Sequence, residues 1–160
     1  MLLPLLQSAA LLAGMGSSAR VGEMSPFPAL VADVRYRSLS AETRVDGAHK
    51  LETRQGWLWH SGADLWAGPL SVGAGYTRRD GGPWVKHVLW LRAGAQHGPL
   101  RLLAEVAPSS RNREMRLEAR YRMRAGRLAC ELRGWVEDHS QTAQVGGYGT
   151  GADVLIGVAR

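Results

Sequence analysis

The sequence predicts an all-β protein: an antiparallel up-and-down meander closed into a barrel of eight to ten strands. Apolar and polar residues alternate over most of the chain from about residue 30, tight-turn dipeptides recur about every 30 residues, and 20 of the 160 residues are glycine. The single cysteine excludes a disulfide framework, and the hydrophobic fraction of 45% is too high for a disordered chain. The sequence predicts no spanning helix, because no apolar run reaches about 18 residues.

Residues 1–19 form a separate apolar zone at the N-terminus. The run from residue 1 to 13 has the length of the apolar core of a signal peptide, and small residues follow it as they do before a cleavage site. The positive charge that usually precedes such a core is missing. Two interpretations stay open, a signal-like export segment and a retained N-terminal strand. Residues 28–160 are assigned to the β-barrel domain.

Two-residue alternation predicts the individual strands, since successive side chains of a strand point to opposite faces. Residues 30–36 and 39–45 already place apolar or small side chains on one face and charged ones on the other. The pattern is clearest over residues 113–124 and continues over 128–137. In 113–124 the apolar face carries Met115, Leu117, Ala119, Tyr121 and Met123, and the charged face carries Glu114, Arg116, Glu118, Arg120, Arg122 and Arg124.

Turn residues predict where the chain reverses. Tight turns are predicted at Arg37-Ser38, Gly68-Pro69, Gly98-Pro99 and Ala125-Gly126. Longer polar or glycine-rich connections are predicted around residues 46–55, 78–83, 108–112 and 138–151. Four hairpins and a last run over 153–159 make nine strands, and the N-terminal apolar segment could supply a tenth. Closure into a barrel is expected, because open edges invite pairing with other chains.

The orientation of the charged face decides the function class. Charges inside a barrel need partners, and arginine suits that position through its forked geometry. Of the 20 basic residues 18 are arginine, and Arg and Glu alternate on consecutive predicted strands. We therefore expect a lumenal ion-pair network. Its predicted members are Glu114, Arg116, Glu118, Arg120, Glu131 and Arg133. Aromatic residues near predicted strand ends (Tyr36, Trp66 and Tyr76) are expected at a membrane interface.

The chain resembles the small outer-membrane β-barrels of Gram-negative bacteria. The shared features are the alternation, the Gly-Pro turns, the short turns opposite long loops and the glycine-rich last strand. The resemblance covers residues 28–160 and is one of architecture, without a family-specific motif. It implies an exported protein of the outer membrane with a structural or binding role.

The basic excess, a net charge of +6, suggests an anionic partner. Six basic residues lie in or beside the predicted long loops and are expected to form one positive rim. The rim would face outer-membrane lipid or lipopolysaccharide phosphates, or an extracellular or assembly protein partner. Its predicted members are Lys50, Arg54, Arg78, Arg79, Arg111 and Arg113. The five histidines are scattered and lack metal-ligand spacing, so we expect no enzyme activity, metal or cofactor.

Two alternatives stay open. The first is a soluble periplasmic or secreted barrel that binds a small apolar ligand or joins a larger assembly. The second, less favoured, is a nucleic-acid-binding or virion-associated β-protein that uses the arginines. A soluble barrel would bury Leu117 and Tyr121 and expose Arg116 and Arg120, whereas a membrane barrel would do the reverse.

Overall fold

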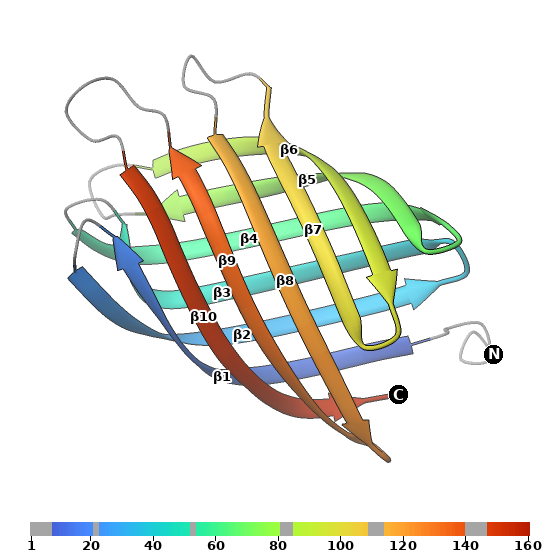
Figure 1. The fold of residues 1–160 in the computed structure, drawn as a ribbon. Helices are drawn as coiled ribbons and strands as arrows, with labels where there is room; N and C mark the ends of the chain where they lie inside the picture. The colour runs from blue at the N-terminus through green and yellow to red at the C-terminus, as the bar shows by residue number, and fades with distance from the viewer. Residues whose placement is uncertain (1–7, 21–22, 52–53, 81–84, 109–113, 140–146) are drawn as a thin grey trace.

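A computed structural model describes residues 8–20, 23–51, 54–80, 85–108, 114–139 and 147–160. They form one closed antiparallel barrel in which consecutive strands pair around the ring and β1 pairs with β10 (Figure 1). The predicted fold class is confirmed. The strands are β1 (Ser8–Arg20), β2 (Glu23–Tyr36), β3 (Leu39–Leu51), β4 (Arg54–Ala67), β5 (Leu70–Asp80), β6 (Val85–His97), β7 (Leu100–Ala107), β8 (Glu114–Ala125), β9 (Leu128–His139) and β10 (Gly147–Ala159). No helix in these ranges is long and apolar enough to cross a membrane.

Strand β1 closes the barrel. It pairs with β2 from Ser8 to Arg20 and with β10 from Ala10 to Arg20. The barrel therefore includes residues 8–20 and 23–27, which the sequence analysis left outside the barrel domain. Residues 8–20 supply the tenth strand. Residues 1–7 of the predicted signal-like segment lie outside the described residues.

The four tight turns lie together at one end of the barrel, called the short-turn end below (Figure 1). Each turn has positive φ at its first central residue: 53° at Arg37, 62° at Gly68, 55° at Gly98 and 62° at Gly126. Positive φ at this position alone suits the type II′ hairpin turn, and the proline that follows Gly68 and Gly98 fixes the negative φ of the second position. The fourth turn is centred on Gly126 and Arg127, one residue later than predicted.

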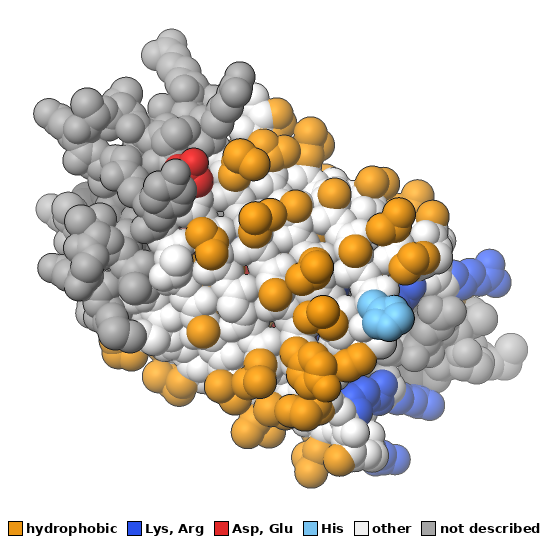
Figure 2. Space-filling view, viewed as in Figure 1, with side chains coloured by type: hydrophobic (Ala, Val, Ile, Leu, Met, Phe, Trp, Pro, Cys, Tyr) orange, Lys and Arg blue, Asp and Glu red, His pale blue; other side chains and the backbone are white. Residues whose placement is uncertain are grey.

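Strand alternation places the apolar faces on the outside of the barrel. Large apolar side chains are exposed over every strand, and Figure 2 shows them spread across the wall of the barrel. Examples on six strands are Leu11, Leu30, Leu65, Leu89, Leu117 and Ile156. The charged faces point inward, so the arrangement is the reverse of that of a water-soluble domain.

One part of the interior is apolar. Leu12, Phe27, Val31 and Leu155 are almost completely buried, and the Phe27 ring packs 6.0 Å from that of Trp135. These side chains come from β1, β2, β9 and β10, which are neighbours in the ring. The lumen thus consists of an apolar sector beside the charged sector that the sequence predicted.

Trp66 corrects one expectation from the sequence. It was expected at the outer surface, yet it lies inside the barrel and is buried, with its indole N–H donating to Ser40 Oγ at 2.8 Å. The reason is parity. Trp66 shares the inward face of β4 with His60 and Asp64, whereas Trp57 and Trp59 occupy the outward face.

The turns provide a test of backbone strain. We expect Gly126→Ala to lower the free energy of unfolding by about 1–2 kcal/mol, because a side chain in the left-handed region is disfavoured. Arg37→Ala is the matched control. Arg37 already carries a Cβ at φ 53°, so its replacement adds no such cost. Urea unfolding of the folded barrel in detergent measures both, and equal losses in the two variants would contradict this account.

Candidate functional site

The candidate site is the charged sector of the lumen. All six residues of the predicted lumenal network lie inside the barrel, buried, and each forms an ion pair. Their partners on other strands come from β3, β5, β6, β7 and β10, so the network links distant parts of the wall. Ion pairing is expected here, because a buried charge without a partner destabilises the fold by several kcal/mol.

Glu42 and Glu118 form the centre of this network, and Arg120 joins them. Arg120 donates to Glu118 and to both carboxylate oxygens of Glu42. Glu42 also accepts from Arg92 at 2.7 Å. Glu42 lies on β3 and Arg120 on β8, five positions apart in a ring of ten strands, so the pair crosses the full width of the lumen.

Two further arginines extend the network toward β10. Arg133 donates to Glu118 at 3.1 Å and to Asp153 at 2.9 Å. Arg44 reaches Asp153 at 2.6 Å and also pairs with Asp46 at 2.6 Å. Arg133 stacks over the Trp135 ring, 4.2 Å from its centre, where the charged sector meets the apolar one. These side chains occupy the middle of the lumen.

At the long-loop end the network continues around Glu114, because Arg79 and Arg116 both pair with Glu137. Arg79 pairs with Glu114 at 3.1 Å, and Lys86 is a second partner. Arg79 was expected in the outer basic rim, but it faces the lumen because it occupies the inward parity of β5. Arg78, its neighbour, lies outside and pairs with Asp80.

The other predicted rim residues are not placed together by the structure. Lys50 and Arg54 belong to β3 and β4, where their backbones pair with Gln55 and Leu51. Their side chains, like Arg111 and Arg113 as a whole, lie outside the described part of the chain. The rim at the long loops therefore stays a prediction for these four residues.

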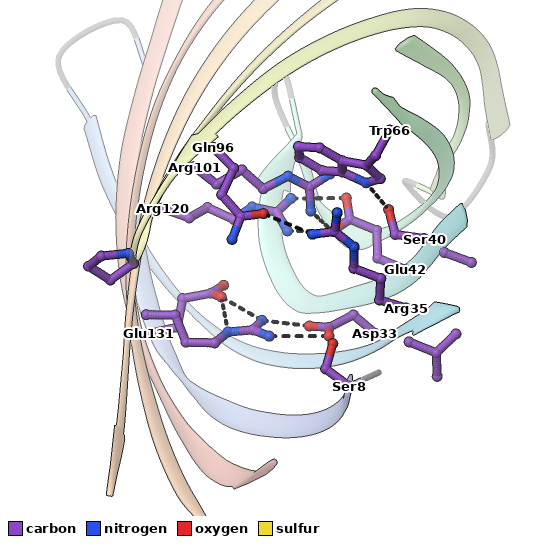
Figure 3. Close-up of a pocket in the computed structure, with 14 residues that line it drawn as sticks. Ser8, Asp33, Arg35, Ser40, Glu42, Trp66, Gln96, Arg101, Arg120 and Glu131 are labelled. Atoms are coloured by element: carbon purple, nitrogen blue, oxygen red, sulfur yellow. Dashed lines mark hydrogen bonds and ion pairs between the residues drawn. The ribbon is translucent and has the colours of Figure 1, made fainter. Parts of the chain in front are cut away.

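At the short-turn end the lumen opens into a cavity of about 130 Å³ (Figure 3). Arg122 spans one side of it, donating to Asp33 at 2.5 and 3.1 Å and to Glu131 at 2.7 Å. On the other side Arg35 and Arg101 approach the Trp66 ring, at 4.7 and 5.2 Å from its centre. Arginine, carboxylate and indole groups thus line the lumen where it opens at this end.

A hydroxyl–imidazole–carboxylate chain lies elsewhere in the lumen. The Thr77 hydroxyl lies 2.7 Å from His60 Nδ1, and His60 Nε2 lies 3.2 Å from Glu105. The Trp90 indole N–H donates to the same hydroxyl at 2.7 Å. The order resembles that of a hydrolytic triad. Each of the three members is exposed by 3% or less, so the three groups offer almost no accessible surface to a substrate.

Sequence reasoning missed several members of the network. Glu42, Arg44 and Asp46 alternate on one face of β3 and could have been found by the rule that identified β8. Arg92 and Asp153 carry no such signal, because the two residues on either side of each are apolar or glycine. Only the cross-lumen distances identify them as partners.

Comparisons with known proteins find similar solved structures but no similar sequence. No protein-family model and no curated protein matches the chain. Among solved structures, the chain is similar to the crystal structure of Neisserial surface protein A (NspA), with 12% sequence identity and a TM-score of 0.38 over 95% of this chain and 94% of that one. Function is therefore inferred below from the side chains of this protein alone.

The network provides a test of stability. We expect Arg120→Gln to lower the free energy of unfolding by about 3 kcal/mol, because Glu42 and Glu118 lose their shared partner inside the barrel. Arg124→Gln is the matched control, since Arg124 is exposed and has no ion pair among the described residues, and its loss is expected below about 0.5 kcal/mol. Urea unfolding in detergent provides the measurement. Equal stability of the two variants would show that the network does not hold the barrel.

Proposed function

We propose that the protein is an integral outer-membrane β-barrel with a structural or binding role and no enzymatic activity. One observation carries this proposal. On strand β8, Arg116 and Arg120 are 6% and 7% exposed, whereas Leu117 and Tyr121 are 60% and 42% exposed. A barrel surrounded by lipid needs this arrangement, and a soluble barrel needs the opposite one.

The apolar exterior supports the proposal by its extent. Single exposed apolar residues are ordinary, but a contiguous belt around a whole molecule is a poor surface for water. On β8 the outward apolar positions run from Met115 to Met123. Nine residues at about 3.3 Å each, along a strand tilted by about 40°, rise by about 23 Å, close to the ~25 Å apolar band of such barrels.

Aromatic side chains mark the long-loop edge of this belt. Trp57 and Trp59 are exposed on the outer face of β4. The Trp59 indole N–H donates to Thr43 at 2.8 Å, and the Tyr76 hydroxyl lies 2.5 Å from His87 Nδ1. Rings with an apolar body and a polar handle suit the boundary between hydrocarbon and headgroups. We place the long loops on the extracellular side, since outer-membrane barrels have short periplasmic turns.

The filled lumen supports a structural or binding role over diffusion. Ion pairs between opposite walls occupy its middle, so binding is assigned to the outer face and the long loops. Anionic groups of lipopolysaccharide, or of an extracellular or assembly protein, are the partners that the predicted basic rim would suit. Arg78 is the rim residue whose side chain lies exposed on the described outer wall.

Membrane insertion is tested directly. The full chain, refolded in detergent and mixed with phosphatidylcholine vesicles, is expected to float with the vesicles and to resist extraction by high salt and alkali. Leu117→Arg, on the lipid face, is expected to reduce insertion, because a midplane arginine costs about 2–4 kcal/mol there. Leu103→Ala, a change on the lumenal side, is the control. A chain that stays in solution without detergent would overturn the proposal.

Closure of the lumen is tested separately. Vesicles that contain the folded protein are expected to take up a neutral pentose no faster than empty vesicles, because the ion pairs leave no open path at mid-height. A double variant, Glu42→Ala with Arg120→Ala, removes side chains from both walls of the lumen and is expected to speed uptake. Rapid uptake through the unchanged protein would contradict a closed lumen.

A further inference from the structure

The described arginines differ between the two ends of the barrel. Nine of them form ion pairs, whereas five have none among the described residues. All five lie at the short-turn end: Arg35, Arg37, Arg124, Arg127 and Arg160. Figure 2 shows Lys and Arg side chains gathered at that end of the visible face. Among the described residues, the arginines without an ion pair therefore lie at the short-turn end.

Two of the five arginines stand at the end of an apolar groove. The groove lies on the outer wall over β1, β2 and β10, and its volume is about 720 Å³. Leu11, Val34 and Val158 are exposed along it, and small residues, among them Ala32, leave it hollow. Arg127 and Arg160 line the same groove. A groove with apolar walls and two cations at one end is complementary to an anionic amphiphile, which has a hydrocarbon chain and a negative headgroup.

Backbone hydrogen bonds hold the two arginines side by side. The Arg127 carbonyl accepts from the Ala159 N–H at 2.9 Å. Arg160 in turn exchanges two bonds with Ala9 of β1, at 2.8 and 3.1 Å. The arginines are thus fixed across the ends of three neighbouring strands, and an anion placed between them could contact both.

No described side-chain carboxylate forms an ion pair with Arg127 or Arg160. Asp33 also lines the groove, but Arg122 binds both of its carboxylate oxygens from inside the barrel. The fitting ligand therefore carries a negative headgroup and a hydrocarbon chain. A soluble anion would use the arginines but leave the apolar walls uncovered.

We propose that this groove binds one anionic phospholipid of the periplasmic leaflet, with its phosphate between Arg127 and Arg160 and an acyl chain along β1 and β10. The proposal rests on the membrane insertion proposed above. It adds a specific lipid site at the end away from the extracellular loops. Near an anionic surface each arginine strengthens binding by about fivefold, so the pair contributes about 25-fold.

The experiment is native mass spectrometry of the folded full chain in neutral detergent, titrated with phosphatidylglycerol or phosphatidylcholine. We expect one phosphatidylglycerol to bind in preference to phosphatidylcholine. The double variant Arg127→Gln with Arg160→Gln is expected to lose about 25-fold in affinity for phosphatidylglycerol and much less for phosphatidylcholine, because choline offsets the charge of its phosphate. Arg124→Gln removes a charge from the same end but outside the groove, and is expected to stay within about twofold of the unchanged protein.

A second variant tests the acyl chain. Ala32→Phe fills the groove and leaves both arginines in place, so we expect both lipids to bind more weakly with an unchanged ratio. If Ala32→Phe binds both lipids normally, or excess inorganic phosphate displaces phosphatidylglycerol, the site holds a soluble anion and the proposal fails.

The remaining outcomes separate this proposal from the previous one. Undiminished phosphatidylglycerol binding by the double variant overturns the site, as does an equal loss in Arg124→Gln, which would indicate a diffuse charge effect. In both cases the protein would still float with phosphatidylcholine vesicles. Failure to float with those vesicles would overturn membrane insertion and the lipid site together.

Discussion

The structure depends on the ion pairs that cross its lumen. Arg120 on β8 binds Glu42 on β3 and Glu118 on its own strand, and Arg133 continues the chain to Asp153 on β10. Each of these charges is buried, and a buried charge without a partner destabilises a fold by several kcal/mol. Closure of the ring brings carboxylates and guanidinium groups from opposite walls together, which compensates these buried charges. Arginine suits this task because its fork can bind two carboxylates at once.

The polar interior and the apolar exterior are two results of one alternation. Once the charged face of each strand points inward, Leu117, Tyr121 and their counterparts on other strands must point outward. The interior is not charged throughout, since Leu12, Phe27 and Leu155 fill the sector beneath β1, β2 and β10. In that sector the molecule resembles a packed core, and Trp135 joins it to the charged sector through its contact with Arg133. Both sectors fill the lumen, which favours a binding or structural role over transport.

The two ends of the barrel differ in chemistry as well as in loop length. At the long-loop end described charges are paired, as Arg79 and Lys86 are with Glu114 and Arg78 is with Asp80. At the short-turn end Arg37, Arg127 and Arg160 have no such partners among the described residues. In the orientation proposed above, this positive, partly apolar surface would lie at the periplasmic leaflet.

The sequence by itself determined the strand period, the four turns and the two faces of each strand, because these features depend on neighbours within a few residues. For the same reason it placed Arg116, Glu118 and Arg120 on one face of their strand, but whether that face points into the lumen was left open between a membrane barrel and a soluble one. Only the tertiary structure decided which residues meet across the lumen, since the pairing of Glu42 with Arg120 depends on closure of the ring. The sequence analysis also did not predict which way the side chains near strand ends point. Trp66 and Arg79 were expected outside but lie inside. The closing partner also required the fold, because the apolar residues 8–20 fit either a signal segment or a strand until pairing with β10 is seen.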